Sequence, residues 1–217
     1  MPPIAAAPVL AAPANFQGIM PINADHENII FMKVGRHAGE NFEQILERKR
    51  REHAAAGKIF WGYGGGTMHP IQKVQPFVRM RIEQGRGIRL VMQTMNSQHP
   101  DTDVFATHYS ADGVTWEEMP AGVEVRGSRY ALVLDAIEEG DLNQELNLSD
   151  YQVGAGPSAG KPAAKYISGR VDKGLLERKP VMSAPFADEG VPEPKIVPVH
   201  YSALLKAPYA VLLKTER

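Results

Sequence analysis

The residues of this sequence that are best suited to binding a ligand lie within 61–69. The run combines aromatic rings, glycines and a histidine: Trp61, Gly62, Tyr63, Gly64, Gly65, Gly66 and His69. An aromatic ring gives a flat surface on which a base can stack, worth roughly 1–3 kcal/mol per base. Glycine lets backbone N–H groups approach a ligand, and histidine titrates near neutral pH. The run therefore predicts a slot for a planar or phosphorylated ligand; the alternative is a core tryptophan beside an ordinary loop.

A second glycine-rich loop spans residues 151–161 and resembles a phosphate-binding loop in outline. In the pattern G-x-x-x-x-G-K-[ST], Ala155 replaces the first glycine and Pro162 replaces the final hydroxyl residue. That hydroxyl holds magnesium in nucleotide hydrolases, so an NTPase is not expected. Ser158 and Lys161 remain candidates for an anion site at the start of a short helix over 162–168. The alternative is a plain turn that begins this helix.

Two identical tetrapeptides, His-Tyr-Ser-Ala, begin at His108 and at His200. Their H-x-[ST] spacing resembles the signature of two-histidine phosphodiesterases. In that family the two histidines act as general acid and base, and the hydroxyls hold the phosphate. The resemblance would assign catalysis on a small nucleotide to His108, Ser110, His200 and Ser202. An ordinary hairpin is the alternative for the first copy, because Asp112-Gly113 follows it and suits a tight turn.

The clearest helix is predicted over residues 39–56. Asn41 can cap its start, with Gln44 completing a capping box, and Gly57 is a natural stop. The basic run 48–51 lies in the second half. It is either a phosphate-contacting face or a set of cations favoured near a helix C-terminus. The second interpretation is preferred, because four successive helical residues cannot point the same way.

Strands must supply most of the remaining framework. The run 28–34 is apolar on both faces, which is typical of a central strand. A helical turn is expected within 74–82. Residues 1–24 form an Ala/Pro-rich extended arm, and 25–217 are expected to form one domain with an irregular Pro-rich segment over 175–194. Further strand-like runs lie at 58–61, 88–95, 104–109, 114–119, 123–125, 130–136, 195–201 and 209–213.

The order of these elements resembles the first half of PUA-like reader domains of the EVE and YTH type, over roughly residues 29–133. A strand leads into a helix, then into Trp61-Gly62, and two further strands follow an irregular segment. Those domains are small mixed barrels that accept a modified base in an aromatic cage. The resemblance implies that Trp61 is one cage wall and Trp116 a second. The chain departs from the YTH pattern at Lys33-Val34, where that family carries Lys-Ser.

The composition of the chain limits which kinds of partner and which cellular setting are expected. A formal net charge of -1 gives no electrostatic footprint for bulk nucleic-acid binding. With no cysteine in 217 residues, disulfides, thiolate chemistry and cysteine-ligated zinc are excluded, which suits a reducing compartment. No apolar run approaches the length of a membrane span. A soluble cytoplasmic protein without membrane contact is therefore expected.

Together these observations predict an α+β fold, a curved mixed sheet or PUA-like barrel with one long and one short helix. The leading hypothesis is non-catalytic recognition of a small nucleotide, modified base or other phosphorylated planar ligand, with no cofactor or metal. Trp61 and Tyr63 would stack, and Ser158 and Lys161 would hold phosphate. Two alternatives stay open. One is a metal-independent phosphodiesterase; the other is an interaction protein, such as a mobile-element inhibitor, with a protein partner or homo-oligomer contacts.

Overall fold

The structure is a computed structural model that describes residues 28–64, 69–98, 102–139, 144–168, 171–180 and 194–216. The predicted arm (1–24), Gly65, Gly66 and residues 181–193 of the Pro-rich segment lie outside these ranges. Within them the chain forms an α+β fold with a large mixed sheet and three α-helices. The predicted α+β class is confirmed at that level.

A nine-stranded sheet organises the fold, in the order β2-β6-β11-β3-β1-β9-β8, with β4 and β5 attached through β11. The order does not return to its start within the described residues, so the sheet is open there. It nevertheless curls, because Trp61 of β2 and Leu175 of β9 share one hydrophobic cluster, the main core. The strands are β1 (Asn28–Arg36), β2 (Ile59–Gly64), β3 (Arg89–Gln98), β4 (Phe105–Ser110), β5 (Glu117–Glu118), β6 (Tyr130–Glu139), β8 (Tyr151–Val153), β9 (Lys173–Arg178) and β11 (Tyr201–Glu216).

β1 is a central strand, as its sequence predicts. It pairs in parallel with β3 and antiparallel with β9. Ile29, Ile30 and Phe31 are all fully buried. Ile30 faces the main core, whereas Ile29 and Phe31 face a second hydrophobic cluster. Burial on both faces explains why the run is continuously apolar rather than alternating.

Helix α2 (Phe42–Ala56) begins and ends as predicted. The Asn41 side chain accepts a hydrogen bond from the Gln44 backbone N–H, and the Gln44 side chain accepts one from the Asn41 N–H, both at 2.9 Å. This capping box satisfies two backbone donors that a helix start otherwise leaves unpaired. Gly57 ends the helix at φ 66°, in the left-handed region.

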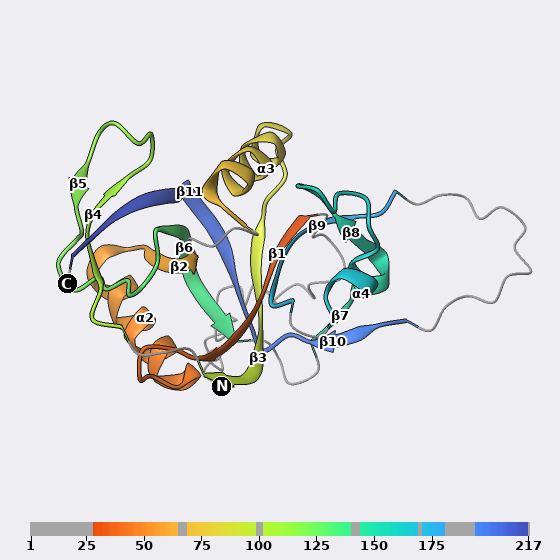
Figure 1. Ribbon diagram of the computed structural model, residues 1–217, viewed down its shortest axis with the longest axis horizontal. Coiled ribbons are helices and arrows are strands. Elements are labelled where there is room, and N and C mark those ends of the chain that lie inside the picture. Colours follow the sequence, from red (N-terminus) through yellow and green to blue (C-terminus); the bar gives the residue numbers. More distant parts are fainter. Residues whose placement is uncertain are drawn as a thin grey trace, which may run out of the picture.

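Helix α3 (Ile71–Glu83) is longer than the predicted turn and contains Pro76. Proline costs about 3 kcal/mol inside a helix. Ile71, Val74 and Phe77 offset that cost, because they lie at helical spacing and are buried in the main core. The prediction of one long helix was therefore wrong. Figure 1 shows α2 and α3 on opposite sides of the strands.

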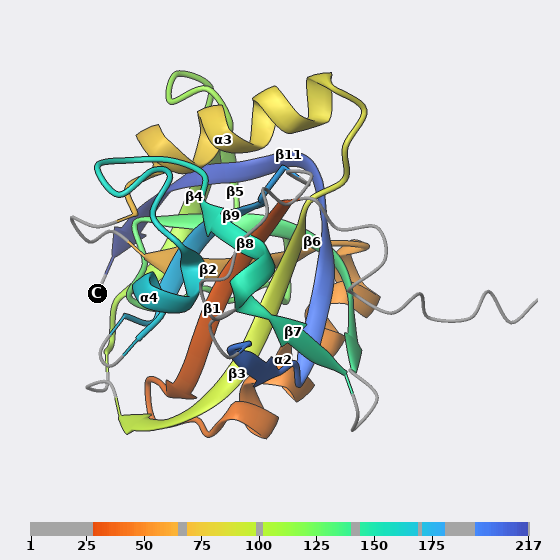
Figure 2. The same ribbon diagram turned by 90° about the vertical axis from the view of Figure 1, so that its right-hand side faces the viewer.

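The second hydrophobic cluster lies under the short elements on the right of Figure 1, which face the viewer in Figure 2. The predicted irregularity over 175–178 was wrong, because these residues belong to β9 and pair with β1 and β8. No helix in the described part of the chain is long and apolar enough to cross a membrane. The short elements here are β7 (Glu145–Asn147), the 3-10 helix η1 (Leu148–Asp150), α4 (Ala163–Tyr166) and β10 (Ile196–Pro198).

The C-terminal apolar run 209–213 packs back onto the sheet within β11. This strand pairs with β3 and β6 in its first part, and with β6 and then β4 in its second part. The turn of the strand coincides with a cis peptide bond at Ala207–Pro208 and a positive φ at Tyr209. β11 therefore connects the hairpin of β4 and β5 to the rest of the sheet.

Candidate functional site

A cavity of about 200 Å³ lies where β1 and β2 face one another without pairing. β2 ends the sheet order, so one of its edges has no strand partner in the described part of the chain. Residues 32–35 of β1 and 61–64 of β2 line the cavity. Side chains of α2, the segment 124–128 and the start of β9 complete its walls.

The two aromatic rings of β2 that face the main core, Trp61 and Tyr63, are fixed from β1. Side chains alternate along a strand, so Trp61 and Tyr63 share the face that packs on the main core. The Trp61 indole N–H donates to Met32 Sδ at 3.3 Å, and the Tyr63 hydroxyl donates to the Phe31 carbonyl at 3.3 Å. Trp61 is 3% exposed and Tyr63 1%. The rings are thus held in place before any ligand enters.

Glycine at position 62 lets the segment 124–128 close against β2. A Cβ atom at Gly62 would lie 2.6 Å from Ser128 Oγ and 3.2 Å from Val125 Cγ1. Real Cβ contacts are not that short, so a larger residue would push this wall outward. Gly62 was predicted as a ligand-facing glycine. It lines the cavity and also determines how closely the segment 124–128 approaches β2.

A buried charge network joins α2 to the cavity wall. Lys49 Nζ donates to both Glu52 carboxylate oxygens, to the Phe60 carbonyl at 2.7 Å and to the Glu124 carbonyl at 2.8 Å. Glu52 also accepts from Arg48 Nη1 and from the Glu124 N–H, both at 3.0 Å. Burial lowers the pKa of Lys49 to about 8, although the Glu52 carboxylate acts in the opposite direction. The network fixes the wall rather than offering donors to a ligand.

The preferred interpretation of the run 48–51 is confirmed in one respect, because its four side chains do spread around α2. Arg51 is exposed and Arg50 pairs with Glu139. Arg48 and Lys49 instead turn inward and line the cavity. Glu52 is the residue of the sequence that could have indicated this inward orientation. It follows Lys49 by three residues and Arg48 by four, which is the spacing of ion pairs along a helix.

Lys173 is a cavity residue that no sequence pattern indicates. It lies more than 100 residues from β2 in the chain, and only the pairing of β9 with β1 brings it opposite Met32. Its Nζ lies 5.3 Å from the centroid of the Tyr63 ring, within cation–π range. Burial lowers the pKa of Lys173, while the Asp172 carboxylate opposes that shift.

His69 lies beside the cavity rather than in its wall. Its ring centroid is 6.3 Å from that of Tyr63, in an edge-on arrangement. Burial lowers the pKa of His69 to about 4, with Lys173 and Lys73 adding like charge and Asp172 opposing them. The imidazole is therefore neutral at pH 7.

Trp116, the expected second cage wall, lies outside this cavity. It lies in the connection between β4 and β5, where Lys214 Nζ is 4.3 Å from its ring centroid. It does not line the cavity, which is built from β1, β2 and β9. The physical reason is that the hairpin packs on the other face of β2, where the Tyr109 ring of β4 lies 5.0 Å from the Phe60 ring, whereas Trp61 and Tyr63 face the main core.

Ser158 and Lys161 do not line the cavity either. The Lys161 N–H donates to the Ser158 carbonyl at 3.0 Å, so the pair forms a turn before α4. The loop packs on α3, as shown by Gly154, whose added Cβ would lie 2.6 Å from Phe77 Cε2. The turn interpretation fits this geometry, and of the predicted residues Trp61, Gly62, Tyr63 and Gly64 line the cavity together.

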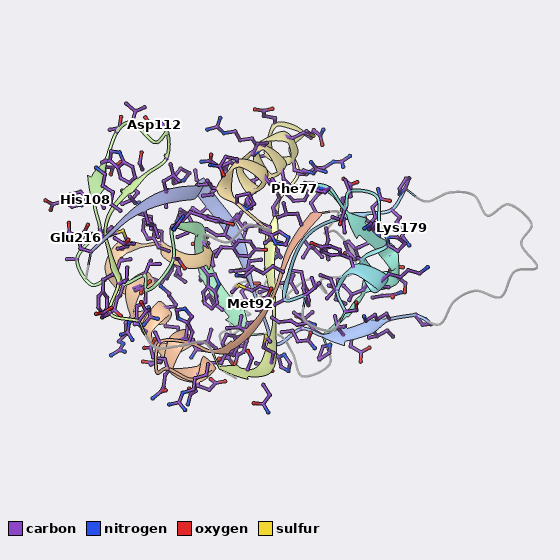
Figure 3. The ribbon with its side chains drawn as sticks, viewed as in Figure 1. Phe77, Met92, His108, Asp112, Lys179 and Glu216 are labelled. Atoms are coloured by element: carbon purple, nitrogen blue, oxygen red, sulfur yellow. The ribbon has the colours of Figure 1, made fainter. Side chains whose placement is uncertain are left out.

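The two histidines of the repeated tetrapeptide are not brought together. His108 on β4 is opposite Lys214, near the end of β11, whereas His200 immediately precedes the start of that strand. The His200 N–H donates to the Met92 carbonyl, and Figure 3 shows Met92 well away from His108, which lies beside Glu216. Ser110 instead stabilises the hairpin turn by accepting from Gly113 N–H at 2.9 Å. Ser202 accepts from Arg89 Nη1 at 3.3 Å. One phosphodiester cannot contact both histidines in this arrangement.

Comparison of the chain with protein-family models, curated proteins and solved structures gives no match.

Proposed function

We propose that this protein binds a single planar ring, of the size and shape of a nucleobase, in the cavity between β1 and β2. The observation that supports this most strongly is the pair of inward-facing aromatic rings, Trp61 and Tyr63, each held by a hydrogen bond from β2 to β1. Fixed rings lose little conformational entropy when a ligand stacks on them, so more of the contact energy reaches the binding free energy.

The size of the cavity favours a ring rather than a complete nucleotide. A cavity of about 150 Å³ holds a benzene ring, and drug-sized ligands occupy about 300–1,000 Å³. At about 200 Å³, this cavity lies near the lower of these values. A base fits that volume; its sugar and any phosphate would then remain outside. The proposal is thus narrower than recognition of a whole phosphorylated ligand.

A reader domain of PUA-like type is part of this proposal. The order β1, α2, β2 with Trp61 at the cavity is what the resemblance to EVE- and YTH-type domains led us to expect, and the curled sheet is compatible with an open form of such a barrel. The separation of His108 from His200 gives no support to the phosphodiesterase alternative. The cysteine-free composition favours a cytoplasmic setting for this binding.

The test uses Trp116→Phe, which leaves Trp61 as the only tryptophan. Trp116 lies outside the cavity, so we expect this variant to bind as the wild type does. Titration with free bases and nucleosides, modified and unmodified, is expected to quench Trp61 fluorescence saturably. Chromatography afterwards checks that each compound is intact. Quenching that occurs in the wild type but is lost in Trp116→Phe would place the ligand elsewhere and overturn the proposal.

The matched variant removes the stacking ring. Trp61→Leu is expected to weaken binding about 5- to 150-fold, as the loss of roughly 1–3 kcal/mol of stacking implies. Calorimetry measures this affinity, because the variant lacks the fluorescent reporter. Trp61→Phe retains a ring and should lose less, and far-UV circular dichroism confirms that both variants fold. Equal affinities in wild type and Trp61→Leu would contradict the proposed site.

A further inference from the structure

Lys173 lines the cavity, and no residue that the structure describes accepts a hydrogen bond from its ammonium group. It belongs to β9, where alternation places its side chain on the same face as Leu175, which is buried in the main core. Its partner on β1 is Met32, the residue that accepts the Trp61 N–H. The lysine therefore enters the cavity from the wall that faces the two aromatic rings.

Other cations of the cavity are already engaged. Lys49 and Arg48 donate to Glu52 and to backbone carbonyls. Arg126 pairs with Glu124 and donates to the Ala38 carbonyl at 3.2 Å. Lys33 also lines the cavity, where its backbone N–H donates to the Asp172 carbonyl at 2.7 Å, but alternation along β1 turns its side chain to the face opposite Met32. Lys173, in contrast, has no hydrogen bond or ion pair to any residue in the part of the chain that the structure describes.

An ammonium group has three donors and no acceptor. The face of Tyr63, 5.3 Å away, attracts its charge but does not replace a hydrogen-bond acceptor. Burial of the ammonium group lowers the pKa of Lys173, although the Asp172 carboxylate opposes that shift. A ligand acceptor that hydrogen-bonds to Nζ would offset the cost of burying the ammonium group. A ring that carries such an acceptor is therefore expected to bind more tightly than one that does not.

The acceptor must belong to the ring itself, because the cavity is too small for a ring together with a phosphate. A carbonyl oxygen is the strongest acceptor that a neutral nucleobase presents, and lysine pairs with such an oxygen when proteins read guanine. Asp172 lines the cavity next to Lys173 and supplies a carboxylate. A carboxylate accepts from an N–H, the group that adjoins the carbonyl in uracil, guanine and hypoxanthine.

We infer that the cavity selects oxo rings in which a carbonyl adjoins a ring N–H, so that the carbonyl accepts from Lys173 and the N–H donates to Asp172. This inference rests on the proposed binding of a planar ring and specifies its chemical class. Adenine and cytosine carry an amino group and an unprotonated ring nitrogen in place of this pair, and the remaining carbonyl of cytidine has no ring N–H beside it. A donor placed against the lysine leaves both groups without a partner, which is costly in a buried site.

The experiment compares inosine with purine riboside, two nucleosides that differ at the position of the exocyclic oxygen. Uridine and cytidine form a second pair. The full-length wild-type protein is expected to bind inosine and uridine at least about tenfold more tightly than purine riboside and cytidine. In Lys173→Met, a side chain of similar length without charge, this preference is expected to fall to less than about threefold, with stacking on Trp61 retained.

Each result decides between the two proposals. Ring binding without preference for inosine and uridine, or a preference for purine riboside and cytidine, would overturn the selectivity and leave the stacking site intact. An unchanged preference in Lys173→Met would also overturn it. Failure of every ring to bind the wild type would overturn the proposed function as well. Lys173→Gln, which keeps polarity but not charge, replaces Lys173→Met if circular dichroism shows that the methionine variant does not fold.

Discussion

At the scale of the residue, His69 shows how the surroundings of the cavity set a proton equilibrium. Burial lowers its pKa to about 4, and the cations Lys173 and Lys73 strengthen that effect. In the unfolded chain the pKa returns to about 6.5. Between pH 6.5 and 4 the unfolded state therefore binds a proton that the folded state does not, so stability is lost as the pH falls through this window.

We expect His69→Gln to reduce that loss by about 2 kcal/mol, a figure lowered from the full linkage value because the ring is partly exposed. The glutamine retains the backbone carbonyl that accepts from the Tyr130 hydroxyl. Urea unfolding of both proteins at pH 7 and at pH 4 measures the difference. Parallel decreases in the free energy of unfolding would show that another group causes the acid sensitivity.

At the scale of the element, α2 is attached to the cavity wall by a carboxylate rather than by apolar contact alone. Glu52 is fully buried and accepts from Arg48, Lys49 and the Glu124 N–H. The last of these bonds fixes the segment 124–128, which closes one side of the cavity. The position of this wall thus depends on one side chain of a neighbouring helix.

We expect Glu52→Gln to destabilise the protein by about 3 kcal/mol, because it leaves the buried Lys49 without its counter-charge, whereas Arg48 keeps its ion pair with Glu40. The matched control is Glu47→Gln on the same helix. Its side chain is 63% exposed and lies 4.0 Å from Arg50, so the change should stay within about 0.5 kcal/mol. Denaturant unfolding measures both free energies, and similar values would contradict the role given to the network.

At the scale of the whole molecule, a shared sheet joins three hydrophobic clusters. β6 alone contributes Leu132 to the main core and Val133 to a third cluster on its other face. Because both faces of the sheet are packed, loss of one cluster exposes the strands that support the next. We therefore expect the described domain to unfold in one cooperative transition.

Leu132→Ala is expected to lower the free energy of unfolding by about 2–5 kcal/mol, since Leu132 is fully buried. Leu204→Ala is the control, because Leu204 on β11 is 40% exposed and should cost under about 1 kcal/mol. Tryptophan fluorescence and far-UV circular dichroism should give coincident transitions in both variants. Two separated transitions in Leu132→Ala would show that the clusters unfold independently.

The sequence by itself determined the local features of this protein. Asn41 and Gln44 lie close enough in the chain to cap α2 with their own atoms. The continuous apolar run of β1 specified a strand buried on both faces, and Trp61 to Gly64 marked one wall of the cavity. Each of these features depends on hydrogen bonds or alternation within a few residues, which a single sequence displays directly.

Only the tertiary structure decided what completes that wall. Lys173 reaches Tyr63 through the pairing of β9 with β1, and Glu124 reaches Glu52 across 72 residues of chain. Contacts between distant parts of the chain also place Trp116, Ser158 and Lys161 outside the cavity and separate His108 from His200. Strand pairing and packing over such separations depend on the whole sheet, and no local spacing of residues encodes them.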